Sequence, residues 1–432
     1  MPVVAVQLGL NSMGLVDTLM VGRVSSVDLA AVALGNLYFF MVGVFGMGLL
    51  MGLDPLVAQA IGAQDRPAAA LAMQRGIVLA VGLTVIAVAG LLLAESAFGL
   101  ARQPGEVIPV AARYALWSIP GVLPFYLFVV LRQSLQAMSR VAPIVWTIVA
   151  ANLLNVALNW VLIWGNLGAP RLGAVGSAMA SSISRWGLVA ILLAIAWPLL
   201  RPYLRPLQVG ILRARPLGRM VALGGPIGMQ FQLEFGAFAM VGVAMGWLGT
   251  VPMAGHQVAL ALASFAFMVP VGVAAAAAVH VGQGVGAREL GRARRAAGAA
   301  LVLGLGFMTV TALIFLTFPR GLSRLFTEDP ATLLVAAALL PIAGVFQIFD
   351  GLQAVAAGIL RGVGDTRVPM YANILGFWIL GIPLGLLLAF PLEMGATGLW
   401  WGLAAGLASV SLLLIWRVRS QLGRELRRVL VD

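Results

Sequence analysis

The sequence predicts an all-α integral membrane protein: twelve transmembrane helices in two parallel six-helix bundles, related by pseudo-twofold symmetry along the membrane normal. Three observations predict this fold class, namely the composition, the number of apolar runs and an internal repeat. Hydrophobic residues fill 61% of the 432 positions and charged residues only 10%. A soluble protein could not cover so apolar a surface with polar groups, so the solvent for most of this chain is lipid.

Twelve apolar runs, separated by short polar breaks, account for most of the length. Each is long enough to cross a bilayer, which takes about 20 apolar residues, and each is continuously apolar, which favours helix over alternating strand. The runs of the first half cover residues 2–21, 29–60, 71–97, 108–134, 141–165 and 173–197. Those of the second half cover 218–247, 253–283, 295–318, 331–360, 367–391 and 395–416. Met1 opens directly into the first run without a basic leader, which argues against a cleavable signal and suggests a truncated or misassigned beginning.

The second half of the chain repeats the first at an offset of 224 residues. Pro2 aligns with Pro226, and the motif VAQAIGA at Val57 aligns with VGQGVGA at Val281. Because six spans bring the chain back to the same side, the two copies are parallel rather than inverted. We therefore expect a first bundle over 1–197, a cytoplasmic linker over 198–218, a second bundle over 219–416 and a cytoplasmic basic tail over 417–432.

The arginines orient the chain in the membrane. All 27 basic residues are arginine, and the net charge is +12. When alternate loops are assigned to opposite sides, 20 arginines fall on one side and 6 on the other, with Arg185 inside a run. The positive-inside rule then places both termini in the cytoplasm. The charge is thus explained by membrane orientation, and we expect no nucleic-acid partner.

Missing residue types exclude several kinds of chemistry. Without cysteine there is no disulfide, thiolate nucleophile or CxxC zinc site. Without lysine there is no Walker A motif and no Schiff base. Neither His256 nor His280 belongs to an HExxH pair. We expect no enzymatic activity, so the energy for any transport must come from an ion gradient or a separate ATPase.

Three carboxylates lie inside the apolar runs: Asp17, Glu234 and Asp350. An ionised side chain at the bilayer centre costs roughly 2.5 to 3.5 kcal/mol, so such a residue indicates an ion, proton or substrate site. The alternative for Asp17 is a helix-end carboxylate that reaches interfacial water. For Glu234 and Asp350 the alternative is a neutral hydrogen-bonding group with a structural role.

Amides and hydroxyls accompany the carboxylate of the first half. Asn155 and Asn159 stand one helical turn apart on one face of their run. Their amide oxygens suit a hard cation such as sodium, although buried amides also tie helices together. Ser181 could add a hydroxyl, and close packing of a small side chain is nearly as good an explanation for it.

Two glutamines and an arginine complete the polar residues inside the runs. Gln347 and Gln353 each lie three residues from Asp350, which places all three on one helix face. Arg185 lies twelve positions from either end of the run 173–197. It could pair with a buried acid, or its side chain could follow a kinked path to water.

Several segments, in order along the chain, carry a resemblance to a known family. They are GLVDTLMVG, LAAVALGN, PLVAQAIGA, LLNVALNW, EFGAF, AGHQVAL and FDGLQAVAAGILRG with the DTRVP turn after it. Together they resemble the multidrug and toxic compound extrusion (MATE) family, and more narrowly its NorM-like branch. The similarity extends over essentially the whole chain, and the motifs are specific as a set.

The resemblance implies a secondary antiporter that exports organic cations and other amphiphilic drugs in exchange for sodium or protons, by alternating access. It implies a multi-pass protein of the bacterial cell inner membrane that works as a monomer in the lipid bilayer. Neither a cofactor nor an ATPase subunit is expected, only the coupling ion.

The resemblance also assigns residues. Glu234 and Asp350 match the acidic residues of the second bundle that the family uses for cation coupling, and they are the expected sodium ligands. The full expected ion-coupling set is Glu234, Asp350, Asp17, Asn155, Asn159 and Ser181. The expected substrate-binding set is Asp17, Glu234, Asp350, Gln257 and Gln347. His256 and Gln257 match a family segment in which packing is the first role to expect, and Arg185 stands where an uncharged residue is usual.

Two other functions compete with drug export. Related two-bundle folds include lipid-linked oligosaccharide flippases, but a flippase should present a strongly basic cleft for pyrophosphate, whereas these arginines crowd the cytoplasmic loops. A membrane scaffold or receptor would not need acids at depth. Saturable, gradient-dependent flux would separate transport from scaffolding.

Overall fold

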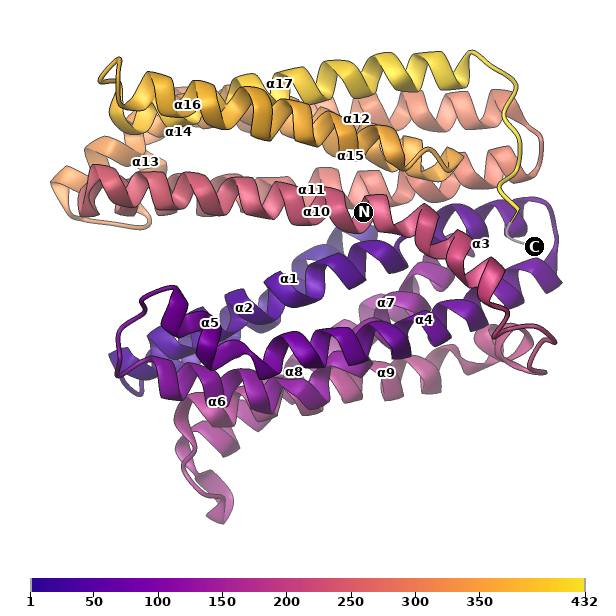
Figure 1. The fold of residues 1–432 in the computed structure, drawn as a ribbon, viewed down its shortest axis with the longest axis horizontal. Helices are drawn as coiled ribbons and strands as arrows, with labels where there is room; N and C mark the ends of the chain where they lie inside the picture. The colour runs from indigo at the N-terminus through magenta and orange to yellow at the C-terminus, as the bar shows by residue number, and fades with distance from the viewer. Residues whose placement is uncertain (1, 431–432) are drawn as a thin grey trace. The chain divides into compact units, whose positions relative to one another are not determined.

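The computed structural model describes residues 2–430, and it is built from helices with no strand in that range. Twelve helical segments are long and apolar enough to cross a membrane, which confirms the predicted number of spans. Their limits are Val3–Val21, Ser26–Gly62, Arg66–Leu92, Ile108–Ala137, Ala142–Trp164, Gly173–Leu204, Ala214–Leu248, Thr250–Gly286, Leu290–Thr317, Pro330–Val363, Arg367–Ala389 and Gly395–Leu422. The chain divides into two compact units, residues 2–228 and 229–430, and Figure 1 labels the helices of each.

The first unit contains nine helices and the beginning of a tenth. They are α1 (Pro2–Val21), α2 (Ser26–Leu50), α3 (Leu53–Gly62), α4 (Arg66–Leu92), α5 (Ala94–Leu100), α6 (Ile108–Ser118), α7 (Val122–Ala137), α8 (Ala142–Trp164), α9 (Gly173–Leu204) and α10 (Ala214–Leu248). Two spans are interrupted: α2 is followed directly by α3, and a short 3-10 turn at Ile119–Gly121 joins α6 to α7. Within this unit α8 packs against α1 and α9, while α6 packs against α2 and α9.

The second unit contains the remainder of α10 and seven further helices. They are α11 (Thr250–Gly286), α12 (Leu290–Thr317), α13 (Pro319–Arg324), α14 (Pro330–Val363), α15 (Arg367–Asn373), α16 (Ile382–Ala389) and α17 (Gly395–Leu422). A π-helical segment, Ile374–Gly381, joins α15 to α16. The central helix is α14, which packs against α11, α12 and α17, and these long helices run side by side in Figure 1.

The boundary between the units lies inside α10, ten residues beyond the 219 expected from the sequence. Glycines explain why the start of this helix packs with the first unit. A Cβ atom on Gly224 would collide with the carbonyl group of Leu49, and one on Gly228 would collide with that of Phe45. Without side chains at these two positions, α10 approaches the backbone of α2 closely.

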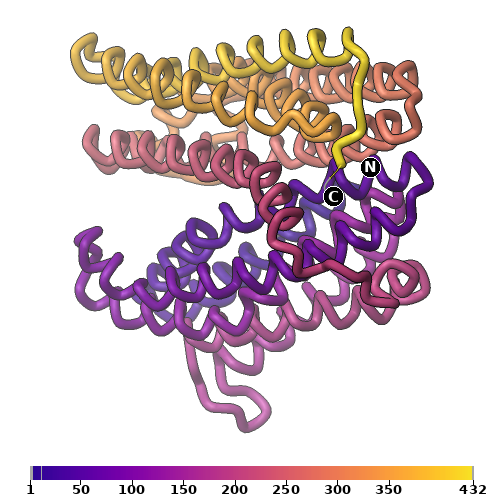
Figure 2. The backbone as a smooth tube through the Cα atoms, turned by 45° about the vertical axis from the view of Figure 1, so that its right-hand side comes forward, coloured from indigo at the N-terminus to yellow at the C-terminus, as the bar shows by residue number. Residues whose placement is uncertain are grey.

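The connection between α9 and α10 is shorter than the expected linker 198–218. α9 continues through Pro198 and Pro202 to Leu204, because a helix can extend past the end of its apolar run and membrane helices tolerate proline. Only residues 205–213 lie outside the two helices, a path that can be followed in Figure 2.

Two buried side chains of α4 fix this connection: Arg75 donates through Nη2 to the carbonyl oxygen of Gly210 at 3.4 Å, and Gln74 makes three further hydrogen bonds. The Nε2 group of Gln74 donates to the carbonyl oxygens of Tyr203, at 2.8 Å, and of Pro206, at 3.1 Å. Its Oε1 atom accepts from the backbone N–H of Gln208 at 2.9 Å. Three backbone groups that a free linker would expose to water are therefore satisfied by the first unit.

Replacing Gln74 with alanine is expected to release this connection. The variant loses three hydrogen bonds, each contributing about 0.5 to 1.5 kcal/mol net, so the segment should detach from α4 more often. Trypsin should then cut faster after Arg213, the arginine of 205–213 that does not precede a proline. Gln103→Ala, which loses one local hydrogen bond to Ala101, is the matched control. Equal cleavage rates in the two variants would contradict the prediction.

Candidate functional site

Asp17, Asn155, Asn159 and Ser181 meet inside the first unit, and we call this group the Asp17 cluster. Asp17 Oδ1 accepts from Asn159 Nδ2 at 2.6 Å, and its Oδ2 accepts from the Ser181 hydroxyl at 2.5 Å. Asn159 Nδ2 also donates to Asn155 Oδ1 at 3.1 Å, and a longer contact of 3.4 Å joins Asn155 Nδ2 to Ser181 Oγ. Both oxygens of the carboxyl group are thus held by neutral donors from two other helices.

The sequence explains why α8 turns these amides inward. Asn155 and Asn159 are spaced by one turn, so they share a helix face, and both are fully buried. The opposite side of α8 carries Leu153 and Trp160, which are exposed. Asp17 on α1 and Ser181 on α9 complete the cluster because both helices pack against α8.

Neighbouring polar residues have other partners. The Ser182 hydroxyl donates to the carbonyl oxygen of Trp117 at 2.8 Å. Asn152 donates to the carbonyl oxygens of Gly9 and Ile148, both at 2.9 Å, and so ties α8 to α1. These contacts hold helices together and lie outside the Asp17 cluster.

Glu234, Asp350, Gln353 and Asn373 form a second polar group, inside the second unit, which we call the Glu234 cluster. Glu234 Oε2 accepts from Gln353 Nε2 at 3.3 Å and from Asn373 Nδ2 at 3.4 Å. Asp350 lies one turn before Gln353 on α14 and is 6% exposed. The two carboxyl groups are close enough to interact electrostatically.

Three buried oxygens of this cluster have no donor among the residues that the structure describes. They are Asp350 Oδ1, Gln353 Oε1 and Asn373 Oδ1. A buried acceptor without a partner is costly, and in a native protein it calls for an explanation such as a bound ion. Carboxylate and amide oxygens are the ligands that a hard cation prefers, so these residues fit a small cation or a proton.

The π-helical segment Ile374–Gly381 positions one wall of the Glu234 cluster. Asn373 immediately precedes this segment, and Trp378 within it donates through Nε1 to the carbonyl oxygen of Leu233 at 3.1 Å. Segments of π-helix are rare and occur frequently at functional sites. Asn373 was not among the residues predicted from the sequence; the signal that could have found it is a lone amide in the apolar run 367–391.

The remaining candidates of the second unit lie apart from these hydrogen bonds. Gln347 Oε1 accepts from the Thr311 hydroxyl at 3.2 Å. Gln257 is exposed and makes no hydrogen bond within 2–430. His256 is buried, and its Nδ1 accepts a hydrogen bond from Trp400 Nε1 at 3.2 Å, which ties α11 to α17.

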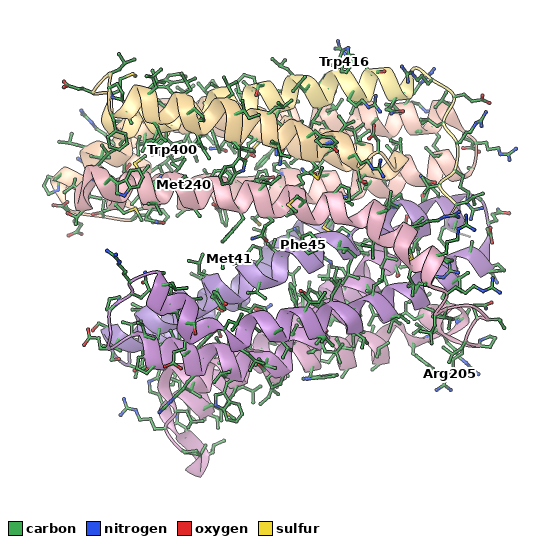
Figure 3. The ribbon with its side chains drawn as sticks, in the orientation of Figure 1. Met41, Phe45, Arg205, Met240, Trp400 and Trp416 are labelled. Atoms are coloured by element: carbon green, nitrogen blue, oxygen red, sulfur yellow. The ribbon has the colours of Figure 1, made fainter. Side chains whose placement is uncertain are left out.

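Figure 3 shows how two tryptophans of α17 differ. Trp400 is fully buried inside the second unit, where its ring packs edge-on against Phe346 and His256. Trp416 projects from the outer side of the helix and is exposed. Trp400 is therefore part of the core around His256.

No group of three or more histidine, aspartate or glutamate side chains suited to a metal ion occurs in the part of the chain that the structure describes. A transition-metal site built from such residues is therefore not seen there. The Glu234 cluster, with two carboxyl groups and two amides, is of a different kind and offers the oxygen ligands that suit a hard cation.

Comparison with known families gives two matches to one family model. The MatE model matches residues 2–161 and again residues 226–387. The matched segments start 224 residues apart, the same offset as the internal repeat. Each copy of the repeat therefore matches the family model once.

Curated relatives align over nearly the whole chain. The chain is 36% identical over 440 residues to the "Probable multidrug resistance protein NorM" of Rhizobium meliloti (strain 1021), with 99% of this chain and 92% of the relative covered. It is 38% identical to the "Multidrug resistance protein NorM" of Burkholderia vietnamiensis, with 96% and 91% covered. With the "Multidrug resistance protein MdtK" of Edwardsiella ictaluri (strain 93-146) the identity is 33%, with 97% and 93% covered.

Solved structures share the fold. A crystal structure of the eukaryotic MATE transporter AtDTX14 superposes with a TM-score of 0.89 at 24% identity, covering 96% of this chain and 93% of that one. A crystal structure of a MATE protein in the bent conformation gives a TM-score of 0.88 at 18% identity, with 98% and 94% covered. At these identities the likeness concerns the fold.

Proposed function

Because the chain belongs to the MatE family, we propose that it is a secondary antiporter that exports organic cations and other amphiphilic drugs in exchange for sodium or protons. The curated relatives are named as multidrug resistance proteins, which supports drug export. The twelve spans and the acids buried within them support transport across the membrane.

The observation that carries the antiport proposal is the Glu234 cluster. Two carboxyl groups that interact electrostatically lie among three buried oxygens without donors. A sodium ion among the oxygens would relieve both the mutual repulsion and the lack of partners, and a proton on one carboxyl group would remove the repulsion and supply one hydrogen-bond donor. This is the behaviour expected of a site that takes up the coupling ion.

Exchange follows if ion and drug compete. A cation held at Glu234 and Asp350 neutralises the charge that attracts a cationic drug, so binding of either ligand lowers the affinity for the other. Linkage makes this coupling reciprocal. Asp17, Gln257 and Gln347 are the further residues proposed to contact the drug, and the Asp17 cluster is the proposed coupling group of the first unit.

The setting proposed for this activity is the bacterial inner membrane. The excess of arginine on one set of loops supports cytoplasmic termini. The drug moves by alternating access in a monomer, with the ion gradient as the energy source and no ATPase subunit.

Ethidium efflux from proteoliposomes tests the proposal. Purified protein is reconstituted, and efflux is driven separately by an imposed sodium gradient and by an imposed proton gradient. We expect saturable efflux with one of them. Drive by sodium alone would make the oxygens of the Glu234 cluster sodium ligands, whereas drive by protons alone would make its carboxyl groups the titrating carriers. Efflux that depends on neither gradient would refute antiport and favour a flippase.

A further inference from the structure

The connection between α9 and α10 exposes side chains of two kinds. Three are large and aliphatic: Leu207, Val209 and Leu212 are 74%, 92% and 76% exposed. The others are basic, and the exposed arginines within 201–215 are Arg201, Arg205, Arg213 and Arg215. No aspartate or glutamate occurs in the sequence between Glu106 and Glu234, so the segment is uniformly positive. A surface that is both basic and apolar is typical of a segment at a membrane interface.

The hydrogen bonds of the connection place it at the depth of the lipid headgroups. Gln74, which binds the backbone of this segment, lies eight residues after the start of α4 at Arg66. A rise of 1.5 Å per residue puts Gln74 roughly 12 Å along the helix, inside the apolar run 71–97. The connection is therefore folded back along α4 to the edge of the span, instead of extending into water.

Buried side chains satisfy part of the backbone of the connection. Gln74 binds the carbonyl oxygen of Pro206 and the N–H of Gln208, and Arg75 donates to the carbonyl oxygen of Gly210. A backbone that approaches hydrocarbon must have partners for its polar groups. These contacts lower the cost of such an approach, and they hold the segment in one place so that its aliphatic side chains are presented together.

Trp197 and Arg205 indicate where the headgroups begin. Trp197 lies at the end of the apolar run 173–197 and is exposed, and tryptophan is enriched at membrane–water interfaces. The guanidinium carbon of Arg205 lies 5.8 Å from the centre of the Trp197 ring, and Arg205 projects outward from the helices in Figure 3. A guanidinium group beside an interfacial indole is at the level of the lipid phosphates, which it binds through parallel hydrogen bonds.

We propose that the connection 205–213, with the arginines beside it, is a binding site for anionic phospholipids. Leu207, Val209 and Leu212 enter the boundary between headgroups and acyl chains, and the arginines bind the lipid phosphates. An anionic lipid is preferred to a zwitterionic one because its net charge offsets that of the segment. The positive-inside rule accounts for arginines on a cytoplasmic loop but not for exposed aliphatic residues among them. This binding goes beyond the proposed antiport and does not depend on it.

A fluorescent label on the connection tests the proposal. The chain contains no cysteine, so Val209→Cys gives a single site for an environment-sensitive NBD label. The labelled full-length protein is placed in nanodiscs of phosphatidylcholine, with or without phosphatidylglycerol. Quenching is measured with lipids that carry brominated acyl chains and, separately, with iodide in the water. We expect phosphatidylglycerol to increase quenching by the brominated chains several-fold and to reduce quenching by iodide, and high salt to weaken both effects.

Arginine variants identify the groups that recognise the lipid. Each arginine near an anionic surface strengthens binding by about fivefold, so the loss of three weakens it by roughly 100-fold. A triple variant of the connection should therefore lose the response to phosphatidylglycerol: Arg205→Gln, Arg213→Gln and Arg215→Gln. The matched control removes three exposed arginines from elsewhere in the first unit and should keep the response: Arg102→Gln, Arg113→Gln and Arg171→Gln. A label at Leu100→Cys, an exposed site on α5, should be quenched equally in both lipid mixtures.

Three results would overturn the proposal. If iodide quenches the label at position 209 equally in both mixtures and brominated chains do not, the connection lies in water. If brominated chains quench it equally with and without phosphatidylglycerol, the segment enters the lipid without selecting anionic headgroups. If the triple variant of the connection keeps the full response, its arginines do not bind the lipid. Leu212→Cys provides a second labelling site, so a poorly folded Val209→Cys protein does not prevent the measurement.

Discussion

Replacing Glu234 with glutamine and Asp350 with asparagine in one variant is expected to abolish gradient-driven ethidium efflux while the protein still inserts and folds. Both replacements keep the shape of the side chain and remove its charge. In the variant, the amide oxygen at position 234 can still accept from Gln353 and Asn373, so these contacts of the Glu234 cluster are preserved. What is lost is the competition between ion and drug, a coupling that is typically about 5- to 150-fold.

The measurement is the initial rate of ethidium efflux under the gradient that drives the wild type, in vesicles matched for protein content. The matched control is a Glu328→Gln, Glu393→Gln double variant, which removes two exposed carboxylates from the same unit. We expect the control to transport normally. A well-expressed Glu234→Gln, Asp350→Asn protein with wild-type efflux would defeat the coupling role of this cluster.

The sequence was sufficient to predict the spans because the bilayer imposes a simple requirement. A backbone in lipid must satisfy its own hydrogen bonds, so long apolar runs become helices. All twelve runs are helical in the structure. The ends were less predictable: α9 continues seven residues beyond 197 and through two prolines, because polar residues beyond the lipid can extend a helix at little cost.

The polar clusters were only partly predictable. An acid in an apolar run is conspicuous, and the spacing of Asn155 and Asn159 puts them on one face. Periodicity within a helix cannot say which other helix that face meets, so the pairing with Asp17 needed the structure or a family resemblance. Gln353 illustrates the limit, because it lies beside Asp350 in sequence yet donates to Glu234 on α10.

The role of Asn373 and the contacts of the connection 205–213 were the features least visible in the sequence. The π-helical segment after Asn373 changes the number of residues per turn, so an α-helical pattern misplaces the side chains that follow it. The hydrogen bonds that hold residues 205–213 against α4 depend on Gln74, about 130 positions earlier. Such a contact between a side chain and distant backbone leaves no periodic signal.

Replacing Asp17 with asparagine should separate charge from structure in the first unit. The asparagine oxygen can still accept from Asn159, and its amide group can donate to Ser181, whose hydroxyl can rotate to accept. The hydrogen bonds of the Asp17 cluster are therefore retained without the carboxylate. We expect efflux to fall to the level of empty vesicles, with a shift in Tm of no more than a few degrees.

Ser181→Ala should give the opposite pattern, which makes it the informative partner of Asp17→Asn. It keeps the carboxylate but leaves Asp17 Oδ2 without its donor in a buried place, which costs about 1 to 3 kcal/mol of stability. We expect a lower Tm together with measurable gradient-driven efflux. Both quantities can be followed in the same preparation, Tm by thermal unfolding in detergent and efflux after reconstitution. If Asp17→Asn instead lowered Tm and transported normally, the carboxylate would be a structural tie between α1, α8 and α9, and coupling in this protein would reside in the Glu234 cluster.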